Sequence, residues 1–249
     1  MKISGNTILI TGGGSGIGQG LAAALHEAGN TVIISGRRRA ALEETVKAHP
    51  GMQFETLDVD SGDDITAFAT RVSKKYPALN VLVNNAGIMR PEDVTAADHT
   101  TDTAEAIVTT NLLGPIRLIA ALLPHLRKQQ QATIINVTSG LAFVPLAFTP
   151  TYSATKAALH SYTQSLRHQL RKTAIEVLEL APPAVATDLM PGQRVNARSM
   201  PLDDYIAESM GILAGTPPNG EILVERVKPL RNAEASATFT GVFNMLNPA

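Results

Sequence analysis

A glycine-rich run near the N-terminus constrains the fold of this chain more than any other feature. The apolar stretch Thr7–Ile10 predicts a buried strand, the run Thr11-Gly-Gly-Gly-Ser-Gly-Ile-Gly18 follows it, and a helical pattern extends from there to Gly29. A strand, a glycine turn and a helix in this order are typical of a loop that binds a dinucleotide pyrophosphate at the helix N-terminus. The alternative is a flexible turn. The predicted cofactor-binding residues of this loop are Gly12, Gly14, Ser15, Gly16, Ile17 and Gly18.

Short apolar runs and helical patterns alternate along the next part of the chain. Further strands are expected at 31–35, 53–57, 81–83, 133–137 and 175–180. Alternation of this kind predicts a parallel sheet that is buried on both faces and that binds ligands at the carboxyl ends of its strands. We therefore expect a single α/β domain over residues 1–249, of the Rossmann-type doubly wound class, with about seven strands and helices on both faces.

The pattern loosens after residue 188. Residues 188–228 begin with a stretch rich in Gly, Pro, Asn and Arg, and we interpret them as a substrate-pocket or lid segment within the domain. Helices are expected at 202–213 and 221–227, and the seventh strand at 238–246.

Composition excludes several classes of function. The formal net charge of −1 gives no electrostatic reason to expect nucleic acid or an anionic membrane as a partner. The chain has no cysteine, which excludes disulfides and thiolate metal sites, and its six histidines show no metal-ligand spacing. No uninterrupted apolar run reaches the roughly 18 residues of a membrane helix. We expect a cytoplasmic protein with no metal site.

The residues after the second strand predict which cofactor is bound. An acidic side chain here would bind the 2′-hydroxyl of NAD, whereas arginine accommodates the 2′-phosphate of NADP. The chain has no acid at this point but reads Gly36-Arg-Arg-Arg39. Arg37 and Arg38 therefore favour NADP(H), with NAD(H) still possible and Arg39 a bystander. The alternative is a basic, solvated helix start.

Two more strand ends carry candidate cofactor contacts. Asp58 and Val59 follow the third strand, where the carboxylate could accept a hydrogen bond from an adenine amino group. Asn85, Ala86 and Gly87 follow the fourth, where small residues allow a ribose to approach closely. Ordinary turns or a helix cap would explain both stretches equally.

A tyrosine and a lysine four residues apart predict the chemistry. On a helix, Tyr152 and Lys156 project from the same face, and the lysine cation is expected to lower the pKa of the tyrosine toward working pH. Tyr152 is then a candidate acid/base. Asn111 lies inside a long helical pattern at 101–126, where asparagine is unfavourable. It either holds a water beside the lysine or is a core amide satisfied by the backbone.

The motifs, in this order and at this spacing, resemble the short-chain dehydrogenase/reductase family over nearly the whole chain. The resemblance implies the strand order 3-2-1-4-5-6-7 and a catalytic tetrad of Asn111, Ser139, Tyr152 and Lys156. Tyr152 would exchange a proton with the substrate oxygen and Ser139 would orient that oxygen. Lys156 and Tyr152 would also contact the cofactor, and Asn111 would hold a relay water. Further cofactor contacts are implied for Pro182, Val185 and Thr187.

The implied activity is NADP(H)-dependent hydride transfer between the nicotinamide and a ketone, aldehyde or secondary alcohol, by a homodimer or homotetramer. The chain departs from the family where Pro183 replaces a glycine and so removes a backbone N–H. Two alternatives are a non-catalytic NAD(P)-binding regulatory protein, and an epimerase or dehydratase on the same scaffold.

The substrate is the least constrained part of the prediction. An apolar pocket is suggested by Met89, Leu141, Phe143, Val144, Phe148 and Met190, although such residues are equally typical of a core. Arg90 or Arg194 could receive a carboxylate or a phosphate.

Overall fold

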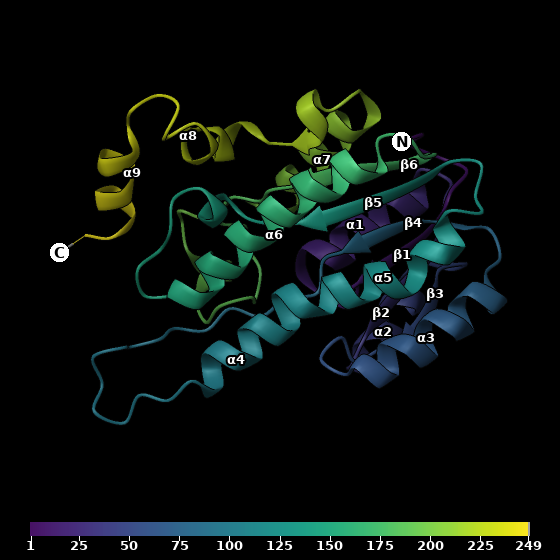
Figure 1. Ribbon diagram of the computed structural model, residues 1–249, viewed down its shortest axis with the longest axis horizontal. Coiled ribbons are helices and arrows are strands. Elements are labelled where there is room, and N and C mark those ends of the chain that lie inside the picture. The colour runs from purple at the N-terminus through teal and green to yellow at the C-terminus, as the bar shows by residue number, and fades with distance from the viewer. Residues whose placement is uncertain (249) are drawn as a thin grey trace.

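The computed structural model describes residues 1–248, within which seven strands form one parallel sheet with helices on both faces (Figure 1). The strand order is β3-β2-β1-β4-β5-β6-β7, which confirms the predicted architecture and order. The strands are β1 Thr7–Thr11, β2 Thr31–Gly36, β3 Gln53–Thr56, β4 Leu79–Asn84, β5 Ala132–Val137, β6 Ile175–Leu180 and β7 Glu221–Ile222.

Helices connect the strands. The α-helices are α1 Gly16–Glu27, α2 Arg39–Ala48, α3 Gly62–Lys75, α4 Asp102–Val108, α5 Gly114–Leu126, α6 Pro150–Leu170, α7 Leu202–Ala214, α8 Lys228–Arg231 and α9 Phe239–Leu246. The shorter helical turns are η1 Thr109–Leu113, η2 Gly140–Ala142, η3 Gln193–Val195, η4 Pro218–Gly220 and η5 Glu225–Val227. The helix expected at 202–213 is confirmed as α7.

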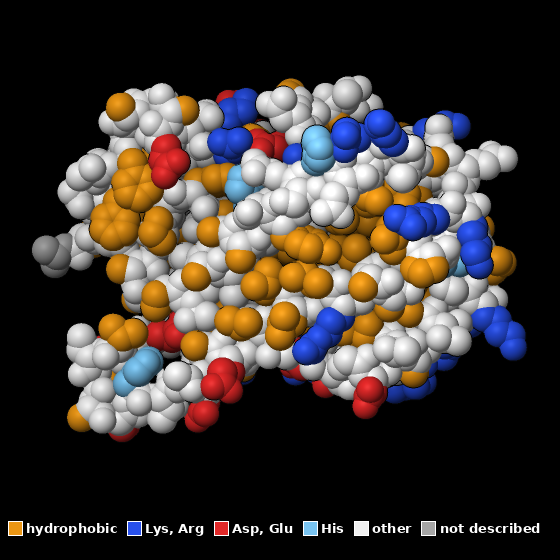
Figure 2. Space-filling view, viewed as in Figure 1, with side chains coloured by type: hydrophobic (Ala, Val, Ile, Leu, Met, Phe, Trp, Pro, Cys, Tyr) orange, Lys and Arg blue, Asp and Glu red, His pale blue; other side chains and the backbone are white. Residues whose placement is uncertain are grey.

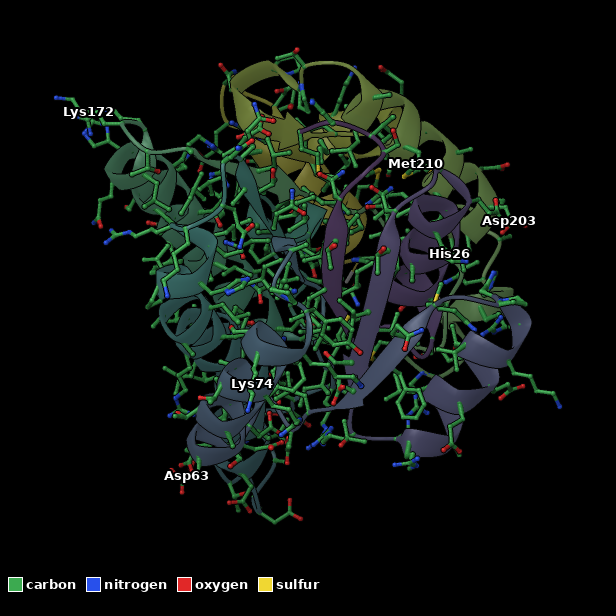
Figure 3. All side chains as sticks on the ribbon, turned by 90° about the vertical axis from the view of Figure 1, so that its right-hand side faces the viewer. His26, Asp63, Lys74, Lys172, Asp203 and Met210 are labelled. Atoms are coloured by element: carbon green, nitrogen blue, oxygen red, sulfur yellow. The ribbon has the colours of Figure 1, made fainter. Side chains whose placement is uncertain are left out.

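Strands β1, β2, β4, β5 and β6 are buried because each of them supplies side chains to two cores. In β1, Ile8 and Ile10 pack into the core beneath α1, α2 and α7, whereas Leu9 packs into the core beneath α3, α5 and α6. Successive side chains of a strand point to opposite faces, so a strand covered on both sides needs a continuous apolar run. Figure 3 shows α1, which carries His26, and α3, which carries Lys74, on opposite sides of the strands.

The helical stretch at 101–126 contains a change of pitch that the sequence did not predict. The segments α4 and α5 are joined by η1, a π-helical turn of five residues that includes Asn111. By length and composition this stretch could cross a membrane, with a mean hydropathy of 1.7 over 18 residues, and 44% of that window is buried. It packs against α3 and α6. Core helices of globular proteins have the same composition, so the apolar stretch fits a core helix.

The C-terminal predictions were wrong. The expected helix at 221–227 is the short edge strand β7 followed by η5, and the expected strand at 238–246 is the helix α9. Helix α9 lies apart from the sheet at one end of the molecule (Figure 1). Asn247, just after α9, bonds back to the loop before α6: its side chain accepts from Ala147 N at 2.6 Å and donates to Pro145 O at 3.1 Å.

Candidate active site

The carboxyl ends of the strands enclose a cleft of about 550 Å³. Every residue predicted to bind cofactor or to act in catalysis lines this cleft, with the exception of Asp58 and Asn111. Six separate strand ends contribute, namely those of β1, β2, β3, β4, β5 and β6. The structure therefore brings together side chains from distant parts of the sequence at the edge where a sheet of this kind binds ligands.

The glycine loop packs too closely to accept side chains. Gly12 adopts φ +69°, and its N–H donates to Ser35 O at 2.7 Å. A Cβ on Gly18 would lie 2.3 Å from Asn85 Nδ2 and 2.4 Å from Gly12 O. Ser15 makes no side-chain cap, and the first turn of α1 contains no acid. The free N–H groups of that turn therefore face the cleft as an anion site.

The two arginines after β2 have different partners. Arg37 Nη1 lies 2.9 Å from Asp60 Oδ2 and 4.0 Å from Asp58 Oδ1, so nearby carboxylates neutralise much of its charge. Arg38 Nη2 donates to Ser15 Oγ at 3.1 Å, which joins it to the glycine loop. Asp58 lies outside the cleft lining, and its own carboxylate accepts from Asp60 N at 3.1 Å. Its contact with adenine stays a prediction.

Ser139, Tyr152 and Lys156 meet at the other end of the cleft. Tyr152 and Lys156 project from α6, and both are buried. Lys156 Nζ donates to Val137 O at 2.8 Å and lies 5.6 Å from the centre of the Tyr152 ring. Ser139 Oγ accepts from Leu141 N at 3.1 Å, and the Ser139 side chain is near enough to Tyr152 to influence the pKa of its phenol.

The pKa of Tyr152 does not shift in the predicted direction. Burial raises the pKa of Tyr152 to about 12, and the hydrogen bond with Ser139 opposes this only in part. Burial also lowers the pKa of Lys156 to about 8. The expected lowering of the tyrosine pKa is wrong here, because desolvation dominates and the ammonium group is directed at the Val137 carbonyl.

Asn111 holds the loop that follows β4. Its side-chain oxygen accepts from Ile88 N at 2.8 Å, and its side-chain nitrogen donates to Ile88 O at 2.8 Å. The amide is fully buried. Of the two alternatives from the sequence, the structure has the core amide satisfied by the backbone, and a contact with a relay water stays a prediction.

A second contact to the same loop has no signal in the sequence. Glu92 accepts two hydrogen bonds from Thr151, from the backbone N at 3.0 Å and from Oγ1 at 2.8 Å. Glu92 N donates to Phe148 O at 2.9 Å. Thr151 immediately precedes Tyr152, so Glu92 fixes the start of the helix that carries the tyrosine. The two residues are 59 positions apart, and only the fold reveals their contact.

Most of the predicted apolar substrate residues lie outside the cleft. Of the six, only Met89 lines it. Val144 is fully buried in the core, and Phe148 is 51% exposed. Leu189 lines the cleft instead, on the segment after β6. Arg194 donates to Asp188 at 2.7 Å and is therefore already paired.

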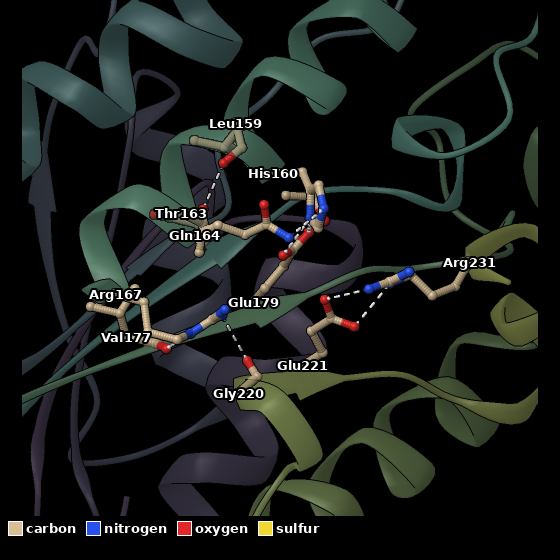
Figure 4. A network of polar contacts seen from close by, with 12 residues as sticks. Leu159, His160, Thr163, Gln164, Arg167, Val177, Glu179, Gly220, Glu221 and Arg231 are labelled. Atoms are coloured by element: carbon tan, nitrogen blue, oxygen red, sulfur yellow. Dashed lines mark hydrogen bonds and ion pairs between the residues drawn. The ribbon is translucent and has the colours of Figure 1, made fainter. Parts of the chain in front are cut away.

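A buried polar network supports the site from behind (Figure 4). Glu179 on β6 has no exposed surface, accepts from Thr138 Oγ1 at 2.6 Å, and lies 2.8 Å from His160 Nδ1. Glu221 on the adjacent strand β7 accepts from Arg231 at 2.9 and 3.0 Å. The network touches the neighbour of Ser139 and the helix of Lys156.

The histidine and the two glutamates of this network were not predicted to come together. His160, Glu179 and Glu221 offer ligand atoms within 4.8 Å of one another, a separation that a metal ion could bridge. The guanidinium of Arg231 already bonds both oxygens of Glu221 and supplies the positive charge. We therefore interpret the cluster as an internal ion network.

Comparison with known proteins points to one family. The sequence model of the short chain dehydrogenase family matches residues 6–197. A curated relative, the "uncharacterized oxidoreductase DltE" of Bacillus subtilis, is 42% identical over 252 residues, covering 99% of this chain and 98% of that protein. An uncharacterized oxidoreductase of Staphylococcus saprophyticus is 31% identical over 194 residues, covering 76% of this chain and 82% of the relative.

Solved structures share the fold. A short chain dehydrogenase from Burkholderia cenocepacia in complex with NADP superposes with a TM-score of 0.83 at 25% identity, covering 100% of both chains. A short chain dehydrogenase/reductase from Burkholderia phymatum in complex with NAD gives a TM-score of 0.81 at 21% identity, covering 100% of this chain and 98% of the other. The second likeness bears on the fold alone.

Proposed function

Because this chain belongs to the short-chain dehydrogenase family of oxidoreductases acting on CH–OH and C=O groups, we propose that it is an NADP(H)-dependent reductase with Tyr152 as acid/base. The substrate class is a small ketone or aldehyde, or the corresponding alcohol. The observation that carries the proposal is the meeting of Ser139, Tyr152 and Lys156 at one end of a cleft whose other end holds the glycine loop and Arg38.

The residues of the cleft fit a nicotinamide dinucleotide. The glycine loop and the free N–H groups of α1 would hold the pyrophosphate, together with Thr187. Arg38 and Ser15, joined at 3.1 Å, would hold a 2′-phosphate, with Arg37 beside them. Pro182 and Val185 would border the nicotinamide. When bound, this cofactor supplies the hydride, and the protein supplies placement and electrostatics.

The protonation state of Tyr152 fits a proton donor. With its pKa at about 12, the phenol is protonated near neutral pH and donates its proton to a carbonyl oxygen. Ser139, which lines the same part of the cleft, would orient that oxygen. Lys156 holds a positive charge beside the tyrosine and would contact the nicotinamide ribose.

Residues 188–228 complete the proposal as a substrate-pocket segment. Asp188, Leu189 and Gln193 line the cleft. Hydrophobic side chains gather over α5 and α6 and over α9 in Figure 2, and α9 buries none of its own residues. These surfaces support assembly as a homodimer or homotetramer. The cytoplasmic location stays a prediction.

The first test is titration of the purified protein with NADPH and NADH, followed by nucleotide fluorescence. NADPH is expected to bind at least ~10-fold more tightly, since a charged hydrogen bond contributes roughly 1.5–3 kcal/mol. Arg38→Ala should remove this preference, and Arg37→Ala should reduce it. Arg39→Ala is the matched control, because Arg39 pairs with Glu43 at 2.8 Å outside the cleft. Equal binding of both cofactors by the unaltered protein would refute the NADP assignment.

The second test separates binding from chemistry. Tyr152→Phe should keep its NADPH affinity and lose about 10²–10⁴-fold in the rate of carbonyl reduction. Tight NADPH binding by the unaltered protein, with no turnover of any carbonyl compound, would indicate a regulatory protein instead. Conversion of substrate without net consumption of NADPH would indicate an epimerase or dehydratase.

A further inference from the structure

We propose that Arg90 makes the mouth of the cleft a receptor for an anionic group, so that the substrate is a carbonyl compound carrying a carboxylate or phosphate. This inference rests on the reductase function proposed above. Arg90 lies on the loop after β4 and lines the cleft that also contains Ser139 and Tyr152. One substrate molecule could therefore place its carbonyl oxygen at those hydroxyls and its anionic group at Arg90.

The backbone that carries Arg90 is fixed on both sides. Two residues earlier, both polar backbone groups of Ile88 bond to the buried Asn111 side chain at 2.8 Å. Two residues later, Glu92 bonds to Thr151 at 3.0 and 2.8 Å, and its N–H donates to the loop before α6. Arg90 is thus held between two anchors, each joined to an element of the active site. Such fixed placement lowers the entropy cost of binding a ligand.

Arg90 is the charged residue of the cleft lining that has no partner. Among residues 1–248, the charged side chains that line the cleft are Arg37, Arg38, Arg90, Lys156 and Asp188. Within that part of the chain, the other four each form a hydrogen bond or an ion pair. No hydrogen bond or ion pair within 1–248 engages the guanidinium of Arg90. Its five donors therefore remain available to a ligand.

The carboxylates near the substrate end already have partners, Glu92 with Thr151 at 3.0 and 2.8 Å among them. Asp188, on the segment after β6, is cancelled by Arg194. Lys156 is buried below the cleft surface and directed at a backbone carbonyl. Arg90 is therefore the cation left to a ligand at the mouth, next to the apolar Met89. A guanidinium fork matches the oxygens of a carboxylate or phosphate. The lining thus favours a ligand with a short apolar stretch between a carbonyl and an anionic end.

The test compares ketones in matched anionic and neutral pairs, with NADPH as reductant. The pairs are keto acids with their methyl esters, and phosphorylated hydroxyketones with their unphosphorylated parents, so the two kinds of anion are distinguished. We expect kcat/KM to be at least ~10-fold higher for the anionic member of the preferred series. Arg90→Gln should abolish this ratio by raising KM for the anionic member, with the neutral member unchanged. Arg90→Lys should restore part of it.

Arg127→Gln is the matched control, since it removes the same charge from an exposed arginine outside the cleft. A ratio that Arg90→Gln leaves unchanged would overturn the inference. So would a loss of NADPH affinity in this variant, because Arg90 would then be a cofactor ligand. If no pair is turned over, thermal shifts of the NADPH-bound protein with the same compounds decide, and equal shifts for anionic and neutral members refute the anion site. Failure to bind NADPH at all would instead refute the proposed function.

Discussion

Replacement of Lys156 by methionine should change how the stability of the protein depends on pH. The buried ammonium has a pKa of about 8 in the folded protein, against 10.5 for an ordinary, solvated lysine. Between these values the unfolded chain binds the proton and the folded chain does not, so stability rises with pH. The cost of burying the charge is fully present below pH 8 and is relieved toward pH 10.5. At about 1.36 kcal/mol per pKa unit, the full effect is about 3 kcal/mol.

The measurement is urea unfolding of the nucleotide-free protein between pH 7 and 9.5. This range avoids the titration of Tyr152. Because the pKa of Tyr152 is raised, stability falls as the pH rises from 10 to about 12, which is opposite to the effect of Lys156. Over the chosen range the unaltered protein should gain about 2 kcal/mol relative to Lys156→Met. Lys172→Met is the control, because Lys172 is exposed and points outward in Figure 3. The Lys172→Met substitution should leave the dependence of the unfolding free energy on pH unchanged.

Parallel curves for the unaltered protein and Lys156→Met would refute the reasoning. They would mean that the lysine keeps an ordinary pKa, and hence that water reaches its ammonium group despite the contact with Val137. An opposite slope would mean that a nearby anion, and not burial, governs the lysine.

Three other substitutions test the contacts around the cleft. Gly18→Ala places a Cβ 2.4 Å from the Gly12 carbonyl oxygen, so unfolding free energy should fall by about 1–3 kcal/mol and NADPH binding should be lost. Glu92→Ala removes both bonds to the start of α6 and should lower kcat with NADPH affinity unchanged, whereas Glu92→Gln should keep most of the activity. Arg231→Ala leaves Glu221, whose side chain is 7% exposed, without its cation, and should destabilise the protein by about 3–5 kcal/mol.

Each of these expectations has an outcome that contradicts it. If Gly18→Ala keeps the stability and the NADPH affinity of the unaltered protein, the glycine loop must relax away from Asn85. Equal kcat values for Glu92→Ala and the unaltered enzyme would exclude a positioning role for that carboxylate. For the ion network, the double variant Glu221→Gln, Arg231→Ala should recover part of the unfolding free energy that Arg231→Ala loses. No recovery would show that Arg231 stabilises the protein by its packing and not by its charge.

The first six strands could be predicted because their signals are local. Each is a short apolar run followed by small or polar residues, and burial on both faces requires that pattern. The segment from Glu221 onward lacks such signals. Glu221 is polar, yet it is buried in a two-residue strand because Arg231 pairs with it. The β-branched and aromatic residues of 238–246 favour a strand, but Phe239 and Phe243 stack at 6.1 Å across one helical turn.

The composition of the site was predictable, but its contacts were not. Spacing placed Tyr152 and Lys156 on one helix face, and the structure keeps them there. The sequence could not show that the lysine binds the Val137 carbonyl, nor that burial would outweigh its effect on the tyrosine pKa. Two further contacts, Glu92 with Thr151 and Glu179 with His160, join distant parts of the chain. Neither residue spacing nor composition could predict them.

The hydrogen bonds between Asn247 and the loop at 145–147 couple the segment after α9 to the catalytic helix. That loop leads directly into the helix of Tyr152, so a displacement of α9 would be transmitted to it. The same hydrogen bonds make the neighbourhood of Asn247 a useful reporter position. An environment-sensitive dye placed beside Asn247 should register movement of the loop, so substrate entry could be followed optically without labelling the cleft itself.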